Sequence, residues 1–481
     1  IYFSENEKNE DTKQIIGEQF LETFKEKGKK IGRISKIEMS KLVDGFRRSI
    51  FNKEPIYAVK LGNELLYRNK DKFFEILYNY SLISTDTNKL VKTFFAEKMI
   101  EKMIEEAKKV NLTELFYDLV FVFGISKITH ILHSLERGIF SLNEIIIYIV
   151  VFVCFINVWN VQTVYMNRYG KHNLLHIIIM TVLQMPALLF MAANVSPDME
   201  DSWTAFTLAI LWIAVVQFLQ YIFAYTKHKH SEKDIKLIKD FLWLLFVGLV
   251  VIVISLFIPG TGRILLTGFG FILSILGSSL FRKDMAMVPI NMPHLIERLT
   301  LFTIITLGEM LMAAANFFEL EKFSINSVLL MFQVVALFLF YISEFDHAIE
   351  DNLPCQSGAG LIYKHYFIWF GLNICTVDVG YANDAMGIIR VIMMFLGLFL
   401  FYLGVLSNSR LNKKSHQLDK KIMIPFVLVY ILGLGSSIVF QSNIPVAIAL
   451  CTLTIILETV LFLTFVLRRY PKKIREEIIW P

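Results

Sequence analysis

Residues 111–134 combine a long apolar run with four ionisable side chains, Glu114, Asp118, Lys127 and His130. On membrane-insertion scales, a charged side chain at the centre of a bilayer costs at least ~2.5 kcal/mol, so a segment that keeps several must partner them or use them. Two interpretations are equally open. The segment is a polar helix neutralised inside a bundle, or it lines a path for protons or a small solute.

The other candidate site residues are ionisable groups in or beside apolar runs further along the chain: Glu297, Arg298, Glu309, Asp346, His365 and Asp378. A histidine is suited to carry protons because its unperturbed pKa is about 6.5. We therefore expect His130, His365 and Asp378 to change protonation. The alternative is that each histidine is a hydrogen-bonded structural residue, which is the more common role in an apolar helix.

Two of these stretches resemble the signatures of the bacterial low-temperature-requirement A family. One is E-L-F-Y-D-L-V-F-V-F-G at residues 114–124, and the other is H-L-I-E-R-L-T-L-F-T-I-I-T-L-G-E at residues 294–309. Shorter matches at residues 165–168 and 345–346 follow in the family's order. The resemblance covers about residues 111–470 and implies a multi-pass membrane protein. It supplies no agreed substrate or reaction.

The composition supports a membrane protein. The chain has 481 residues, of which 55% are hydrophobic, whereas soluble domains contain about 45–50% apolar residues. A net charge of +5 is small for this length, so we expect the lipid bilayer as a partner and no nucleic acid. Four cysteines without a C-x-x-C pair predict neither a disulfide framework nor a zinc site.

Motifs for catalysis are missing from the sequence. We find no catalytic triad, no phosphate-binding loop, no zinc-spaced histidine pair and no C-terminal lipidation signal. We therefore predict no catalytic residue, no metal site and no cofactor, and we favour a protein that is not an enzyme.

Residues 1–110 differ from the rest because they are charged throughout and contain no apolar run of the ~20 residues that a spanning helix needs. We predict a soluble helical N-terminal domain. Its last part, residues 86–109, has apolar residues at helical spacing, which favours a packing face over a membrane-surface helix. We predict no signal peptide, and the absence of an initial Met indicates a trimmed or fragmentary start.

From residue 112 onward we predict an all-α bundle of about twelve membrane spans. The apolar segments that are long enough lie near residues 112–134, 140–164, 173–195, 202–226, 238–258, 262–281, 295–316, 325–346, 361–383, 387–408, 422–441 and 444–467. Connecting loops alternate between rich and poor in Lys and Arg, with fifteen such residues on one side and four on the other. Under the positive-inside rule, this alternation predicts an inner-membrane protein with both termini in the cytoplasm.

The polar positions recur along the chain, which predicts two six-helix halves, residues 111–290 and 291–470, in parallel orientation. A basic cytoplasmic tail, residues 471–481, follows. The acidic opening of the first span is repeated about 180 residues later at Glu297. A histidine opens both the third and the ninth span, at His172 and His365.

If the halves are related in this way, Asp118 and Arg298 lie at the same depth and form an ion pair. Lys127 and Glu309 lie deeper and form a second candidate pair. Arg298 and Glu309 are about 20° apart on a helical wheel, but Asp118 and Lys127 are half a turn apart. Lys127 therefore has an alternative partner on another helix; the candidates are Glu344, Asp378 and Asp384.

Two further residues predict local features of the helices. Pro186 falls inside the third span and predicts a kink. Gly308, next to Glu309, predicts that a neighbouring helix packs closely there.

The function that we infer from the sequence is secondary transport of a small solute coupled to protons or ions. Two alternatives remain open. One is a membrane-anchored sensor or scaffold that signals through the N-terminal domain, and the other is an intramembrane lipid-handling enzyme. Further candidate partners are a second copy of the chain and a cytoplasmic protein that binds residues 1–110.

Overall fold

The computed structural model describes the residues 37–52, 55–83, 93, 97, 110–132, 141–170, 173–197, 199, 202–227, 232–288, 290–350, 357–382 and 387–470. Contacts divide the chain into two compact units, residues 1–109 and residues 110–481. The described residues form helices, turns and a single isolated bridge between Ile349 and Asn412. The predicted helix over residues 86–109 lies outside the described residues except for Thr93 and Glu97, as does the tail at 471–481.

The first unit contains three described helices, α2 (Met39–Phe51), α3 (Pro55–Arg68) and α4 (Lys70–Ile83). One face of each helix is apolar, and these faces enclose a small core of Leu42, Phe46, Leu65 and Ile76. The Arg68 guanidinium at the end of α3 donates to the Ile37 carbonyl, just before α2, at 2.8 Å.

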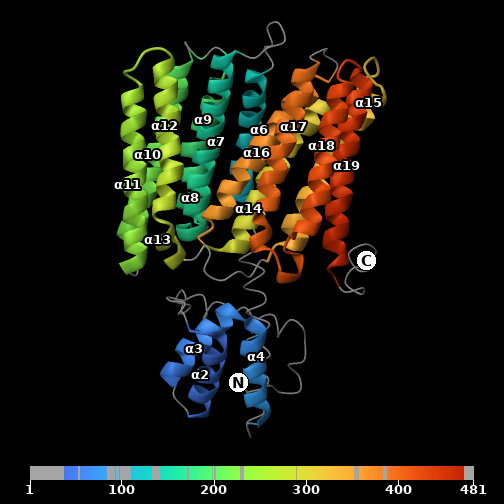
Figure 1. Cartoon of the computed structure of the whole chain (residues 1–481). Coiled ribbons are helices and arrows are strands. Elements are labelled where there is room, and N and C mark those ends of the chain that lie inside the picture. Colours follow the sequence, from blue (N-terminus) through green and yellow to red (C-terminus); the bar gives the residue numbers. More distant parts are fainter. Residues whose placement is uncertain are drawn as a thin grey trace, which may run out of the picture. The chain divides into compact units, whose positions relative to one another are not determined.

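The second unit is a bundle of long helices (Figure 1). Its helices are α6 (Leu112–Ile131), α7 (Leu142–Tyr169), α8 (Leu174–Ile178), a π-helical turn (Ile179–Gln184), α9 (Met185–Ala193), α10 (Trp203–Lys227), α11 (Glu232–Ser255), α12 (Thr261–Leu280), α13 (Arg282–Met287), α14 (Met292–Ala315), α15 (Ile325–Ile342), a second π-helical turn (Ser343–Ala348), α16 (Ala359–Gly380), α17 (Ile388–Leu406), two short 3-10 turns (Ser407–Leu411 and Lys414–His416), α18 (Lys420–Val439) and α19 (Ile444–Arg468).

Nine helical segments in the described part of the chain are long and apolar enough to cross a membrane. They fall at nine of the twelve predicted spans. The other three predicted spans correspond to α6, α12 and α16, which are helices of 20, 20 and 22 residues. At 1.5 Å per residue, each is about 30 Å long, close to the thickness of the hydrocarbon core. The chain is therefore an all-helical, multi-pass membrane protein.

The polar-rich helices α6 and α16 lie inside the bundle, whereas the apolar helices α11 and α18 lie at its surface. α6 contacts α7, α9, α14 and α16, and α16 also contacts α17. By contrast, only 17% of the apolar window is buried in α11 and in α18. Because unpaired polar groups are costly in hydrocarbon, this arrangement shields the ionisable side chains behind apolar helices.

The order of helix contacts is the same in the first and second groups of six spans. In the first group, α6 contacts α7 and α9, and the contacts then run from α9 to α10, α11 and α12 and from α12 back to α7. In the second group, α14 contacts α15 and α16, and the contacts run from α16 to α17, α18 and α19 and from α19 back to α15. In Figure 1, α11 and α19 lie at opposite edges, and α6, α14 and α16 lie between them.

The kink predicted at Pro186 stays a prediction. A π-helical turn, Ile179–Gln184, precedes this proline, and the helix continues beyond it as α9. The prediction for Gly308 was wrong. A Cβ added at this position would meet no atom within 4 Å, and α14 runs through it unbroken. A glycine in an apolar helix permits close packing, but it does not by itself bring a neighbour to that face.

Close packing occurs instead between α16 and α17. A Cβ added at Gly371 would lie 2.5 Å from the Gly397 carbonyl oxygen and 2.6 Å from the Phe401 nitrogen. Both are backbone atoms that cannot rotate away, so the two helices are held at backbone-contact distance. This contact fixes α16 in the centre of the bundle.

We expect Gly371→Ala to destabilise the protein by about 1–3 kcal/mol, because the added methyl group forces α16 and α17 apart. Thermal unfolding of the purified protein in detergent measures this loss. The matched control is Gly435→Ala in α18, where an added Cβ meets nothing within 4 Å; it should leave stability unchanged or raise it. Equal effects of the two substitutions would contradict the close contact.

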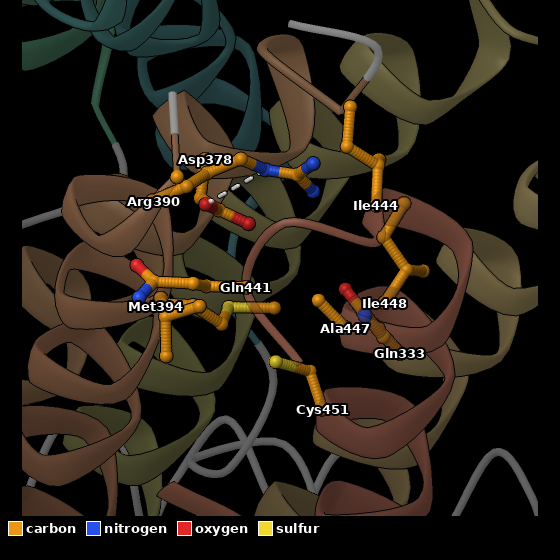
Figure 2. A pocket seen from close by; sticks show the side chains of 11 residues that line it. Gln333, Asp378, Arg390, Met394, Gln441, Ile444, Ala447, Ile448 and Cys451 are labelled. Atoms are coloured by element: carbon orange, nitrogen blue, oxygen red, sulfur yellow. Dashed lines mark hydrogen bonds and ion pairs between the residues drawn. The ribbon is translucent and has the colours of Figure 1, made fainter. Parts of the chain in front are cut away.

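Two small pockets lie in the described part of the bundle. One has a volume of about 20 Å³ and is walled by Gln333, Asp378, Arg390 and Cys451 (Figure 2). The other, of about 50 Å³, includes Asn157 and Asn160 in its lining. Each has room for one or a few water molecules.

Candidate functional site

A buried ion pair joins the two signature helices. The Asp118 carboxylate on α6 accepts from the Arg298 guanidinium on α14 at 2.6 Å, and the side chains of both residues are almost completely buried. This is the shallow pair expected from the sequence, and its geometry confirms that expectation. Asp118 and Arg298 each lie within about two turns of the start of their helix. The pair therefore lies near the N-terminal ends of α6 and α14.

A second carboxylate shares the same arginine. Glu114 Oε2 lies 3.2 Å from Arg298 Nη1 and 3.0 Å from His294 Nε2. The His294 Nδ1 atom is 3.2 Å from the Asn167 amide nitrogen. Because an amide nitrogen only donates, Nδ1 accepts, and the ring proton of a neutral His294 lies on Nε2 facing Glu114.

The orientation of the Asn167 amide is itself fixed by the backbone. Its nitrogen donates to the Asn291 carbonyl at 2.9 Å, and its oxygen accepts from the Asn291 N–H at 2.8 Å. The next residue, Arg168, donates to the carbonyls of Val288 and Ser357. The end of α7 therefore holds the start of α14 in place, which positions His294.

The two contacts follow one rule of spacing. Asp118 and Arg298 are 180 residues apart, and so are Glu114 and His294. Because successive turns of α6 meet successive turns of α14 in the same order, the two helices run parallel. Each acidic residue of α6 thus meets a basic residue at the corresponding position of α14.

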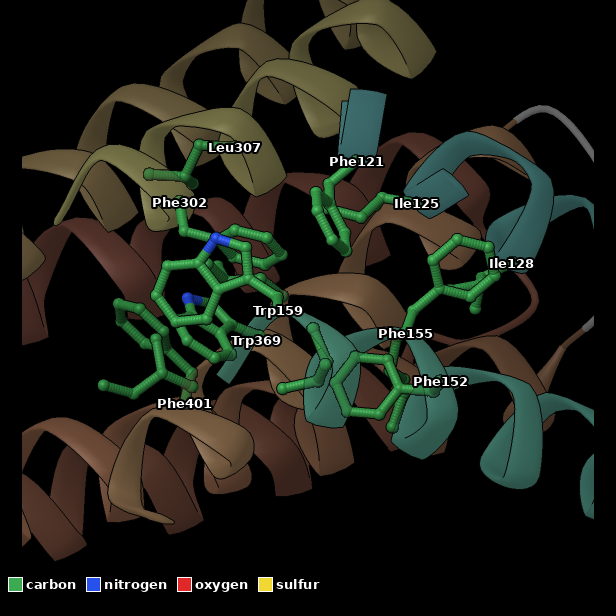
Figure 3. Close-up of a cluster of buried hydrophobic side chains, with 14 of the residues drawn as sticks. Phe121, Ile125, Ile128, Phe152, Phe155, Trp159, Phe302, Leu307, Trp369 and Phe401 are labelled. Carbon is green, nitrogen blue, oxygen red and sulfur yellow. The ribbon is translucent and has the colours of Figure 1, made fainter. Parts of the chain in front are cut away.

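A cluster of aromatic side chains that includes Trp159, Trp369 and Phe302 (Figure 3) contacts this charge cluster through Trp159. The Trp159 indole N–H donates to Asp118 Oδ1 at 2.8 Å, and the Arg298 guanidinium lies 5.4 Å from the indole ring centre. Trp159 packs edge-on against Trp369 at 5.3 Å, and Phe302 contacts both rings. Because these rings are buried and apolar, they strengthen the electrostatic interactions beside them.

The helices that carry this cluster lie within a stretch that matches a known family. Residues 109–461, more than half of the chain, match the model of the bacterial low temperature requirement A protein. The chain belongs to this family. No curated protein matches the sequence. The two motifs found in the sequence, residues 114–124 and 294–309, lie on α6 and α14, which meet here through opposite charges.

The deeper candidate pair is not formed. Lys127 makes no ion pair within the described part of the chain, and its ammonium group lies 5.4 Å from the Phe123 ring centre. Glu309 faces α6 at Ser126 and His130 instead. Asp118 and Lys127 are half a turn apart on α6, so the lysine points away from α14. Of these two side chains, only the Asp118 carboxylate reaches the α6–α14 interface.

Two of the three proposed alternative partners of Lys127 are engaged elsewhere. Glu344 accepts from the Asn412 amide at 3.1 Å, and Asp378 pairs with Arg390 at 3.3 Å. Asp384 lies outside the described residues.

Two further predicted site residues lie at helix ends. Glu297 is half-buried, and its carboxylate accepts from the Val110 N–H at 3.0 Å, which fixes the chain just before α6. Asp346 is exposed in the π-helical turn after α15. Neither joins the cluster around Arg298.

His365 on α16 is fully buried and forms two hydrogen bonds. Its Nδ1 atom is 2.9 Å from the Leu361 carbonyl oxygen, and its Nε2 atom is 3.0 Å from the Tyr341 hydroxyl. A neutral ring protonated on Nδ1 satisfies both partners. A similar pair joins Tyr165 and His176 at 3.2 Å in the first group of spans. The geometry favours the structural interpretation of His365. His172 lies outside the described residues.

Asp378, also on α16, lines the smaller pocket with Arg390 (Figure 2). The Arg390 guanidinium also donates to the Ala382 carbonyl at 2.7 Å. This pair lies at the opposite end of α16 from His365, so the candidate residues on α16 form two separate sites.

Sequence reasoning missed several polar partners. His294 belongs to the second motif but is not among the candidate site residues of the sequence analysis. Neither is Trp159, nor Glu458, a fully buried acid of α19. Trp159 gave no periodic signal because a tryptophan in an apolar helix is indistinguishable from core. Glu458 could have been found as the only acidic residue in the last apolar span.

Proposed function

We propose that this protein is a secondary transporter that couples movement of a small solute to protons or ions across the cell membrane. The observation that carries the proposal is the buried cluster of Glu114, Asp118, Arg298 and His294 between α6 and α14. Ionisable groups kept at such a position in a membrane bundle are found mainly in pathways and proton relays.

The charges in this cluster do not balance. It contains two carboxylates and one guanidinium, and the hydrogen bond from Asn167 fits a neutral His294. The cluster therefore carries one net negative charge when both carboxylates are ionised. Uptake of one proton by one of the two carboxylates neutralises the cluster, so we propose proton binding as the coupling step.

Two six-helix halves, related by an axis along the membrane normal, would convert this step into movement. The matching order of helix contacts in the two groups of spans supports such halves. So does the 180-residue spacing, because residues near a twofold axis meet their own counterparts. Loosening the α6–α14 contact on proton uptake would allow one half to rock against the other. The loop charges support cytoplasmic termini and an inner-membrane location.

A second candidate function is a membrane-anchored sensor. The observation that favours it is the small volume of the two pockets described above, each of which holds only a few water molecules. In a transporter, this conformation corresponds to an occluded state, and the α6–α14 interface must open in another state. Access of water to that interface distinguishes the two functions.

The test uses a single reactive cysteine at the interface. Ser126→Cys, in a Cys355→Ser background, places a thiol beside Glu309; the other three cysteines are buried. We expect a charged, membrane-impermeant thiol reagent to modify it in membrane vesicles, with a rate that changes several-fold when the pH on one side is shifted.

The matched control is Leu432→Cys, on a side chain that α18 exposes at the bundle surface. A lipid-facing thiol should resist the charged reagent from both sides. If Ser126→Cys reacts as slowly as this control in vesicles of both orientations and at every pH, the transporter is excluded and the sensor is favoured.

A further inference from the structure

A second buried acid lies far from the α6–α14 cluster along the sequence. Glu458 is the fifteenth residue of α19, a helix of 25 residues, and is therefore near the middle of a span. Its side chain is 0% exposed. Neither carboxyl oxygen has a hydrogen-bond partner of good geometry among the described residues.

Among the residues that the structure describes, the groups around Glu458 do not include a cation. The Tyr402 hydroxyl of α17 lies beside the carboxyl, and its own hydrogen-bonding capacity is unused. Tyr430 of α18 is near, but its hydroxyl donates to the Phe395 carbonyl at 2.5 Å. α15, which also packs on α19, carries Tyr341 as its one ionisable residue, and Cys375 of α16 faces the two tyrosines.

An ionised carboxylate in this environment would be unpaired and without water, which is among the costliest arrangements in a membrane protein. It is stable only if it binds a proton or a metal cation. A sodium or calcium ion needs several oxygen ligands around it. The described polar groups beside Glu458 are the Tyr402 hydroxyl, which is unused, and the Tyr430 hydroxyl, which already donates to a carbonyl. These are too few oxygen ligands for a metal cation, so the site fits a proton.

A route to Glu458 begins at the pocket of Figure 2. Cys451 lines that pocket, and Glu458 follows it by seven residues, two turns further along the same face of α19 and about 10 Å away. Asp378 and Arg390 form the polar wall of the pocket. Gln333 reaches from the pocket to the Thr452 hydroxyl at 3.0 Å, and its amide oxygen has no hydrogen-bond partner among the described residues.

We propose that Glu458 is a proton-binding site in the middle of the second group of spans, protonated at neutral pH and supplied through the pocket lined by Asp378 and Arg390. This site is separate from the α6–α14 cluster, and its protonation does not depend on solute transport. Proton release requires water to enter between the pocket and Glu458, past the buried Ile455.

Infrared difference spectroscopy of the purified full chain tests the proposal. The spectrum of the wild type minus that of Glu458→Gln should contain the carbonyl stretch of a protonated carboxylic acid at neutral pH. Glutamine is isosteric with the neutral acid, so the thermal midpoint of this variant should equal that of the wild type. Tyr402→Phe should shift the frequency of the band, because it removes the adjacent hydroxyl.

The control is Glu319→Gln, which changes a largely exposed carboxylate and should leave the band unaltered. Ala447→Leu, which fills the pocket, should slow exchange of the Glu458 proton with D₂O by at least several-fold. A missing acid band, or a band that appears only when sodium and calcium are removed, overturns the proposal. Unchanged exchange in Ala447→Leu overturns the route.

Discussion

Replacing Arg298 with Met should destabilise the protein by roughly 3–5 kcal/mol, the loss typical of removing one partner from a buried ion pair. Arg298 is 0% exposed and lies against two carboxylates, at 2.6 Å from Asp118 and 3.2 Å from Glu114. Without the guanidinium, both acids remain buried with one neutral imidazole and one indole N–H. They must then take up protons or draw water into the helix interface.

Thermal unfolding in detergent, together with the yield of folded protein, measures this effect. Arg410→Met is the matched control, because Arg410 is exposed in the turn after α17. Arg298→Lys should lose less than Arg298→Met, since a lysine keeps the charge but lacks the planar fork that contacts two carboxylates. If Arg298→Met lowers the free energy of unfolding no more than Arg410→Met does, the cluster does not stabilise the fold.

Exchanging the charges of Asp118 and Arg298 should recover a large part of the stability that each single reversal loses. Asp118→Arg alone places two guanidinium groups against Glu114, and Arg298→Asp alone places three carboxylates together. The double variant restores one cation and two acids at the same depth. We expect a coupling energy toward the upper end of the ~0.5–3 kcal/mol seen for contacting residues.

Recovery should be incomplete because the site is not symmetric in its hydrogen bonds. The Trp159 N–H donates to Asp118 in the native protein and would face a guanidinium after the exchange. Four proteins, the wild type, both single variants and the double variant, complete the thermodynamic cycle. As a control, Asp118→Arg combined with Arg390→Asp should show no recovery, since Arg390 pairs with Asp378. Simple addition of the two losses in the exchanged variant would disprove the pairing.

The sequence alone determined the class of the protein and one contact of the site. Long apolar runs predicted an all-helical membrane bundle because lipid leaves no other way to satisfy the backbone. The repeat of about 180 residues predicted that Asp118 meets Arg298. The half-turn between Asp118 and Lys127 indicated that one interface cannot hold both, and Lys127 indeed forms no ion pair with Glu309 in the described residues.

Only the tertiary structure decided which polar groups complete each site. Helical periodicity gives the face and the approximate depth of a residue, but it does not identify which neighbouring side chain reaches it. The Trp159 indole and the Asn167 amide come from a different helix, and their roles depend on distances of about 3 Å. Gly308 faces open space, whereas Gly371 holds two backbones together, although both are glycines within apolar helices. Such differences arise from how the helices pack against one another.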